Sequence, residues 1–190
     1  MNEEHFIEQL KNGDEVAFAE LIKQFGDKAF NTCLGLLQNT EDAEDTAQEV
    51  FVEVFQSIHQ FKGESKLSTW IYRIAVTKSL EFLRKKNRKK RFAFVQSLFG
   101  MESILPNNDK AHFYHPGIQL ENKEFASLLF LALQKLPENQ RVAFTLIKAE
   151  GLTYVETAAI IKVSIKAVEA LMHRAKESLR KYLQESQTIH

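Results

Sequence analysis

Apolar residues recur at spacings of three and four along most of the chain, which is the period of an amphipathic helix. The 190 residues include only 7 Gly and 3 Pro to interrupt such helices. The period is lost between residues 93 and 120, where Gly100, Pro106, Pro116 and Gly117 gather. We therefore predict an all-α protein with two small helical domains, residues 1–92 and 121–190, joined by a linker over residues 93–120.

In the first domain, apolar stripes predict short helices near residues 6–10, 18–25 and 30–37. A longer helix follows, with Thr40 as its expected N-cap. The apolar face of this helix is made of Ala47, Val50, Phe51, Val54, Phe55 and Ile58. Its opposite face carries the carboxylates of Asp42, Asp45, Glu49 and Glu53. The helix is therefore predicted to bury one side and to present an acidic strip on the other.

The segment KGESKLS after Phe61 predicts a short loop, with Ser68 capping a helix that starts at Thr69. This helix ends in RKKNRKKR, where seven of eight residues are basic. Basic side chains near a helix C-terminus complement the helix dipole, so part of this placement has a structural reason. Seven basic residues within eight positions are more than a helix cap requires, so we expect this end of the helix to contact a negatively charged partner.

The second domain ends in a predicted pair of helices. Pro137 stands at the first position of an earlier helix. Thr153 and Glu156 have the capping-box spacing and open a short helix, and Ser164 caps a long one directly after it. Two helices joined by about three residues form a helix-turn-helix, whose second helix enters the major groove of DNA. Because αα-hairpins without DNA function use the same pattern, a plain interaction module remains an alternative at this point.

The formal net charge is zero, from 25 basic and 25 acidic residues, but the charges are segregated along the chain. Residues 1–60 carry 3 basic and 13 acidic residues, a net of −10, whereas residues 61–92 carry a net of +9. The linker has a net of −1 and residues 121–190 a net of +2. Segregation of this kind predicts surfaces for different partners, although a block of like charge can also be only a solvated face.

Several classes of protein are not expected from the sequence. The single cysteine, Cys33, excludes an internal disulfide and a cysteine-only zinc site, and its place on an apolar stripe predicts burial. The acidic start and the lack of a long apolar run predict a cytoplasmic protein without a signal peptide or membrane span. No phosphate-binding Gly-rich loop, nucleophile with a base, or metal-ligand spacing is present, so we expect neither an enzyme nor a cofactor. His112 and His115 lie three residues apart, but with Pro116 adjacent and no nearby cysteine we expect no metal there.

Four blocks of sequence, in order, resemble the signatures of extracytoplasmic-function (group IV) sigma factors of RNA polymerase. They are DAEDTAQEVF (42–51), FKGESKLSTWIYRIA (61–75), LPENQR (136–141) and GLTYVETAAIIKVSIKAVEALMHRAKESL (151–179). The KAVEALMHRA variant resembles versions common in Bacteroidetes. The resemblance implies a transcription initiation factor that binds core RNA polymerase, recognises the minus-ten and minus-thirty-five promoter elements and aids strand opening. It also implies an anti-sigma factor as a partner.

The resemblance assigns roles to residues of this chain. It implies core-polymerase contacts from Asp42, Asp45, Gln48, Glu49 and Glu53. It implies minus-ten contacts from Lys62, Ser65, Lys66, Ser68, Trp70, Tyr72, Arg73, Thr77, Lys78, Arg84, Lys85, Lys86 and Arg88, with core packing as the alternative for Trp70. It implies minus-thirty-five contacts from Ser164, Lys166, Ala167, Glu169, Ala170, His173, Arg174 and Lys176.

The chain departs from the family pattern at several of these positions. Thr77 and Glu81 stand where the family often has Asn and Asp. Lys162 stands at the helix-turn-helix turn where Gly is common, and it is expected to adopt a left-handed conformation at a cost on the order of 1 kcal/mol. In the recognition helix, Glu169 and Leu171 replace a common Lys and Arg. The remaining alternative is a helix-turn-helix regulator that binds duplex DNA without polymerase, although a net charge of only +2 disfavours strong independent binding.

Overall fold

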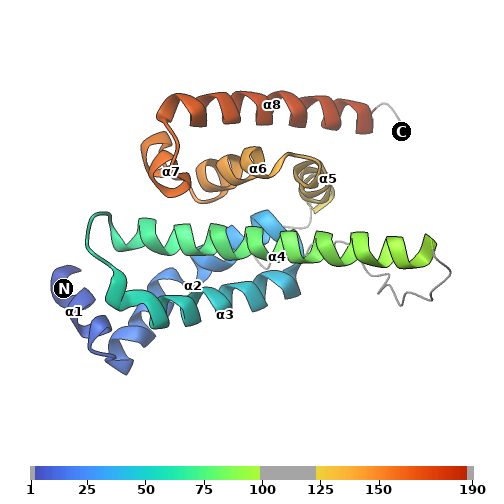
Figure 1. Ribbon diagram of the computed structural model, residues 1–190. Helices are drawn as coiled ribbons and strands as arrows, with labels where there is room; N and C mark the ends of the chain where they lie inside the picture. Colours follow the sequence, from blue (N-terminus) through green and yellow to red (C-terminus); the bar gives the residue numbers. More distant parts are fainter. Residues whose placement is uncertain (1–2, 99–122, 188–190) are drawn as a thin grey trace.

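The computed structural model of the chain describes residues 3–98 and 123–187 (Figure 1). Within these residues the regular structure is helical, so the all-α prediction is confirmed. The first part contains α1 (Glu3–Lys11), α2 (Glu15–Leu37), α3 (Thr40–Ser57), the 3-10 turn η1 (Ile58–Gln60) and α4 (Leu67–Leu98). The second part contains α5 (Lys123–Gln134), α6 (Glu138–Phe144), the π-helical turn η3 (Thr145–Ala149), α7 (Tyr154–Ile161) and α8 (Ile165–Gln187).

The core of the first part lies where α2, α3 and α4 pack together. The apolar stripes of the three helices supply side chains such as Leu21, Cys33, Val50 and Ala75, all of which are fully buried. Leu10 of α1 closes one end of this core. The arrangement leaves the acidic face of α3 directed away from the core, as the sequence predicts.

The boundaries of several elements differ from the sequence prediction. Residues 18–25 and 30–37 belong to one continuous helix, because burial of α2 against α3 and α4 offsets the cost of about 1 kcal/mol for Gly26 in a helix interior. The N-cap of α3 is Asn39 rather than Thr40, since the Asn39 side chain accepts a hydrogen bond from the Asp42 backbone at 2.8 Å. Ser68 is not a cap, because α4 already begins at Leu67.

Two further boundaries shift by a few residues. Pro137 is the N-cap of α6 and not its first helical residue. Helix α4 continues to Leu98, so the first six residues of the expected linker are helical. The remainder of that linker, with His112 and His115, lies outside the described residues. Within residues 3–98 and 123–187, none of the helices combines the length and the apolar composition needed to span a bilayer.

The second part lies directly on the first (Figure 1). Its helices α6 and α7 lie between α8 and the layer formed by α2 and α4. A buried apolar cluster crosses the boundary, with members from α2, α4, α6, η3 and α7: Leu36, Tyr72, Val76, Val142, Leu146 and Ile160. The two regions therefore share a core in this structure, which the sequence does not predict.

Candidate protein- and DNA-binding surfaces

The solvent face of α3 carries the acidic strip. Asp45, Gln48 and Glu49 are exposed, and their positions three and four residues apart place them on one side of the helix. Val52 lies beside them and is 55% exposed. These side chains, with Glu53, Gln56 and Lys78, line a shallow groove of about 420 Å³. A rigid helix with exposed carboxylates around an apolar residue can bind a basic surface of another protein.

Phe55 does not lie in the core, contrary to the sequence prediction. It is 56% exposed and meets the ring of Phe18 edge-on, with the ring centroids 4.9 Å apart. Ala47, Val50 and Val54 take up the buried face of α3, so Phe55 falls on the edge of the stripe. The exposed ring adds apolar area beside the acidic strip.

The two outer carboxylates of the strip form salt bridges with lysines of the same chain. Glu53 pairs with Lys78 at 2.8 Å, and Asp42 pairs with Lys86 at 2.9 Å. The hydrogen bond to Glu53 is the main cause that raises the pKa of Lys78. Both lysines belong to α4 and are expected to contact DNA, whereas both carboxylates are expected to contact polymerase. The two expected surfaces thus meet along the α3–α4 boundary.

The loop over residues 62–66 joins the turn after α3 to α4. Lys62 and Lys66 are exposed, whereas Ser65 and Ser68 are half-buried. Gly63 has a positive φ of 74°, a conformation that favours glycine and lets the loop reverse direction. Trp70 is half-buried and packs on Phe61, with the ring centroids 5.2 Å apart. Trp70 therefore combines a packing role with a partly accessible ring.

Tyr72 and Arg73 form hydrogen bonds to the second part of the chain, and Arg73 remains half-buried. Tyr72 is only 6% exposed, and its hydroxyl donates a hydrogen bond to Glu150 Oε2 at 3.0 Å. Burial and the nearby carboxylate of Glu150 raise the pKa of Tyr72. Arg73 donates from Nη2 to the carbonyl of Ala159 at 2.8 Å and from Nε to that of Ile160 at 3.4 Å. In this arrangement Tyr72 is hydrogen-bonded to Glu150, the residue after η3, and Arg73 is hydrogen-bonded to α7.

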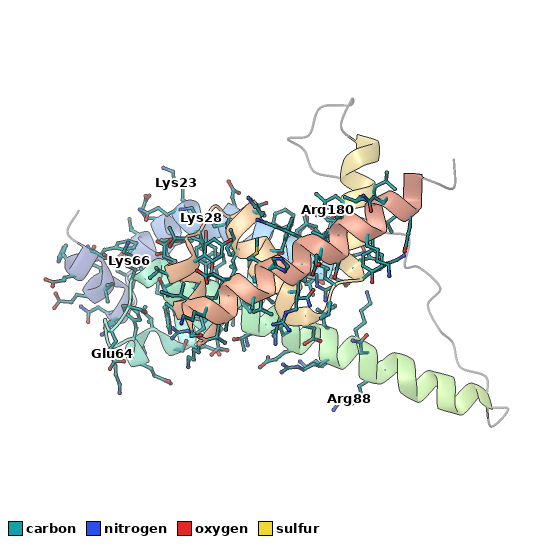
Figure 2. All side chains as sticks on the ribbon, turned by 90° about the horizontal axis from the view of Figure 1, so that it is seen from above. Lys23, Lys28, Glu64, Lys66, Arg88 and Arg180 are labelled. Atoms are coloured by element: carbon teal, nitrogen blue, oxygen red, sulfur yellow. The ribbon has the colours of Figure 1, made fainter. Side chains whose placement is uncertain are left out.

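The basic residues further along α4 are open to solvent. Arg84, Lys85 and Arg88 are exposed, and Figure 2 shows Arg88 on the half of α4 that extends past the rest of the molecule. Thr77 is also exposed, but its hydroxyl donates to the carbonyl of Arg73 one turn earlier, at 2.8 Å. This extended half of α4 can bring positive charge to a phosphate backbone.

The helix-turn-helix formed by α7 and α8 is capped as the sequence predicts. The Thr153 side chain accepts a hydrogen bond from the Glu156 backbone, and the Glu156 carboxylate accepts one from the Thr153 backbone at 2.9 Å. These backbone and hydroxyl hydrogen bonds from Thr153 lower the pKa of Glu156. Ser164 accepts from the backbone of Ala167 at 3.2 Å at the start of α8. Lys162 adopts the expected left-handed conformation, with φ 56° and ψ 48°.

The outward face of α8 contains the residues expected to meet DNA. Val168, Met172, Ala175 and Leu179 are buried, which turns the intervening positions to solvent. The exposed residues at those positions are Ser164, Lys166, Glu169, Ala170, His173, Arg174 and Lys176, while Ala167 is half-buried. This face offers small residues that permit close approach at its N-terminal end and basic residues further along.

Three features of this face bear on its charge. His173 Nδ1 lies 3.6 Å from a carboxylate oxygen of Glu177, one turn further along α8. Arg174 Nε donates to the carbonyl of Ala170 at 3.2 Å. Leu171, a departure from the family pattern, is half-buried and packs against the core beneath α8.

Sequence reasoning missed the residues at the boundary between the two parts. Glu150 accepts a hydrogen bond from Tyr72, which lies 78 residues earlier in the chain. Thr145 packs against Gly35, which lies 110 residues earlier. No local spacing links such distant positions, so no sequence pattern of a single chain could have indicated the contacts. Among the residues described, no group of three or more His, Cys, Asp and Glu side chains is placed to hold a metal ion.

The family profile of Sigma-70 region 2 matches residues 21–89, and that of Sigma-70 region 4 matches residues 127–179. The ECF RNA polymerase sigma factor SigW of Bacillus subtilis is 31% identical over 180 residues, covering 94% of this chain and 95% of the relative. The ECF RNA polymerase sigma-E factor of Escherichia coli is 26% identical over 179 residues, covering 94% and 93%.

Solved structures that share the fold include the following two. CnrH, solved in complex with the cytosolic domain of CnrY, has a TM-score of 0.69 at 20% identity and covers 96% of this chain and 97% of that one. The sigma factor RpoE of Bartonella quintana, solved with the anti-sigma factor NepR, has a TM-score of 0.63 at 23% identity and covers 88% and 96%.

Proposed function

The chain belongs to the extracytoplasmic-function sigma factors of RNA polymerase, and we propose how its surfaces divide the work of such a factor. A sigma factor directs RNA polymerase to promoters. We assign core-polymerase binding and minus-ten recognition to residues 1–92 and minus-thirty-five recognition to residues 121–190, with residues 93–120 as the linker. The Bacteroidetes-like character of the variant remains a prediction.

The centre of the polymerase contact is the exposed part of the acidic strip, Asp45, Gln48 and Glu49. The observation that carries this assignment is their common exposure on α3, inside the segment matched by region 2. Asp42 and Glu53 lie at the edges and are already paired with Lys86 and Lys78, so they exchange partners on binding or act by fixing α4 against α3. Long-range attraction to a basic partner mainly raises the association rate and sets the orientation.

The minus-ten strand is held by the loop over residues 62–66 and by the first half of α4. A base read on its pairing edge has to leave the stack, which costs a few kcal/mol, so an aromatic surface and backbone-neutralising cations are needed. The partly accessible ring of Trp70 supplies the surface, and Arg84, Lys85 and Arg88 supply charge. Tyr72 and Arg73 join this site only after the second part of the chain moves away.

The minus-thirty-five element is read by the N-terminal half of α8. Ser164, Lys166 and Glu169 lie at the end of the recognition helix that enters the major groove in this motif. Glu169 can accept a hydrogen bond from cytosine N4, and Arg174 with Lys176 can contact phosphates. His173 contributes a donor on the same face.

The chain acts by binding and carries out no chemical step of its own. Its place of action is the cytoplasm, where RNA polymerase and promoter DNA are found. An anti-sigma factor is its further partner, and the support for this is that a sigma factor of the same fold forms a complex with one.

The division of labour can be tested with two sets of charge changes. In the first variant, Asp45 and Glu49 are changed to Lys; in the second, Arg84 and Lys85 are changed to Ala. Lys86 is left intact because it pairs with Asp42. The first variant should lose core binding, measured by co-elution with purified core polymerase, and the second should keep core binding but open promoters poorly in a permanganate footprint.

Circular dichroism and thermal unfolding serve as controls, since all four side chains are exposed and their replacement should leave the fold intact. Equal loss of the same activity in both variants would contradict the proposed division. The alternative, a regulator that binds duplex DNA alone, predicts that the Asp45 and Glu49 changes have no effect and that core polymerase is not required.

A further inference from the structure

We propose that Ala170 selects a thymine in the minus-thirty-five element by contact with the 5-methyl group of that base. The inference rests on the proposed function, because α8 is assigned there to this element. Helix α8 lies on the outside of the molecule, with α6 and α7 beneath it (Figure 1). The outer face of α8 is therefore open to a DNA duplex.

Ala170 stands at the centre of this outer face. Val168 and Met172 fix the inner face, because both are buried in one apolar cluster with Ala143 of α6 and Ala158 of α7. Ala170 lies two residues from each of them, which is about half a turn of a helix with 3.6 residues per turn. Its side chain therefore points away from the buried side, and it is exposed.

The side chains around Ala170 are mostly polar. Its surface neighbours, three and four residues away on the same face, are Lys166, Ala167, His173 and Arg174. Arg174 Nε donates to the Ala170 carbonyl at 3.2 Å, and His173 Nδ1 lies 3.6 Å from a carboxylate oxygen of Glu177, one turn further along. Ala170 remains exposed between these two side chains. The centre of the face is therefore a methyl group among charged and polar neighbours.

A methyl group at this position restricts the base that it can recognise. The Ala170 side chain has no donor or acceptor, so it forms no hydrogen bond to the edge of any base. The 5-methyl group of thymine is the apolar group of the major groove, and alanine is one of the residues that contact it. The other three bases present polar edges, which would lose water without gaining a partner. Ala170 therefore favours thymine.

Two larger apolar side chains near the start of α8 are also exposed, but they lie elsewhere. Val163 is 40% exposed and belongs to the turn before the helix. Ile165 is 43% exposed and lies three residues before the buried Val168, so it is on the side of α8 next to the inner face. Neither occupies the centre of the outer face, so the methyl contact there falls to Ala170.

The experiment removes the methyl group from the DNA and from the protein in turn. A library of random duplex DNA is selected with the full chain bound to core polymerase, and the enriched duplexes are aligned. Each thymine of the upstream shared element is then replaced by deoxyuridine, which lacks only the 5-methyl group. Dissociation constants for the thymine and uracil duplexes are measured for the parent, for Ala170→Gly and for Lys176→Ala.

For the parent we expect one thymine whose replacement weakens binding about fourfold, which corresponds to about 0.8 kcal/mol for one buried methyl group. Ala170→Gly should bind the two duplexes equally, because the protein's side of the contact is gone. A loss of helix stability caused by glycine affects both duplexes alike and cancels in this comparison. Lys176→Ala is the control for a phosphate contact: it should weaken binding to both duplexes and keep the fourfold ratio.

Three outcomes overturn the proposal: no uracil replacement weakens binding, the fourfold ratio persists in Ala170→Gly, or the selection enriches no upstream element. A persistent ratio would assign the methyl contact to another side chain, such as Ile165. Failure of the parent chain to co-elute with core polymerase would instead refute the proposed function. The selection is then repeated with the full chain alone, and the same three outcomes decide the role of Ala170.

Discussion

Replacing Lys162 by Gly should stabilise the protein, although it removes a side chain of the helix-turn-helix. Lys162 holds a left-handed conformation with φ 56° and ψ 48°, because the chain has to reverse between α7 and α8 while its backbone N–H bonds to the Ala158 carbonyl. A non-glycine residue in this conformation costs about 1–2 kcal/mol. Glycine removes that strain, but it also stabilises the unfolded chain by about 0.4–1 kcal/mol, because it gives that chain more conformational entropy. The expected net gain is about 0.5–1 kcal/mol.

Gln38 provides the matched comparison. It ends α2 in nearly the same conformation, with φ 59° and ψ 27°, but its side chain is buried and its Nε2 donates to the Gly35 carbonyl at 3.2 Å. Glycine at position 38 relieves similar strain but loses this hydrogen bond, worth about 1 kcal/mol, together with the buried side chain. We expect Gln38→Gly to be destabilising by about 1 kcal/mol.

The assay is urea unfolding of the full chain, monitored by circular dichroism, with a urea midpoint determined for each unfolding transition. The reasoning predicts a higher urea midpoint for Lys162→Gly and a lower one for Gln38→Gly. A Lys162→Gly chain that is no more stable than the parent would show that this turn is not strained. Equal stabilisation by both changes would show that the buried contacts of Gln38 contribute nothing.

Three other predictions concern single side chains. Because burial and Glu150 raise the pKa of Tyr72, its contribution to the unfolding free energy is present below the ordinary tyrosine pKa of about 10 and is lost as pH rises above it; Tyr72→Phe should abolish that part of the pH dependence in urea titrations. Burial raises the pKa of Cys33 to about 11, so at pH 8 native chain should react with a thiol reagent far more slowly than urea-unfolded chain. Thr153→Ala removes the cap of α7 and should lower the unfolding free energy by about 1 kcal/mol in urea titrations, whereas Thr153→Ser should retain most of it.

The helices and their faces followed from local pattern. The periods of three and four located the buried residues of α3 and α8, and the spacing of Thr153 and Glu156 located a capping box that the structure contains. Errors occurred where two local solutions differ by one residue, as at the cap of α3, where Asn39 rather than Thr40 has the required geometry. The continuity of α2 through Gly26 was also missed, because packing against neighbouring helices offsets the local penalty.

The candidate site was predicted in its composition but not in its arrangement. The exposure of Asp45, Glu49 and Arg174 follows from their place opposite a buried stripe, which sequence shows directly. The burial of Tyr72 could not be predicted, because it depends on packing against Val142, Leu146 and Ile160 of the second part of the chain. Trp70 and Tyr72 lie two residues apart and so point to different sides of α4, but the period does not show which side the second part of the chain covers.

The sequence by itself determined the helical class, the two domains' motifs and the segregation of charge, since each depends on residues within one or two helical turns. Only the tertiary structure decided how the charged segments meet. It pairs Lys78 with Glu53 and Lys86 with Asp42, and it places Glu150 on Tyr72. The physical reason is that such pairs form between elements brought together by burial of their apolar faces, and their geometry is set by packing rather than by spacing along the chain.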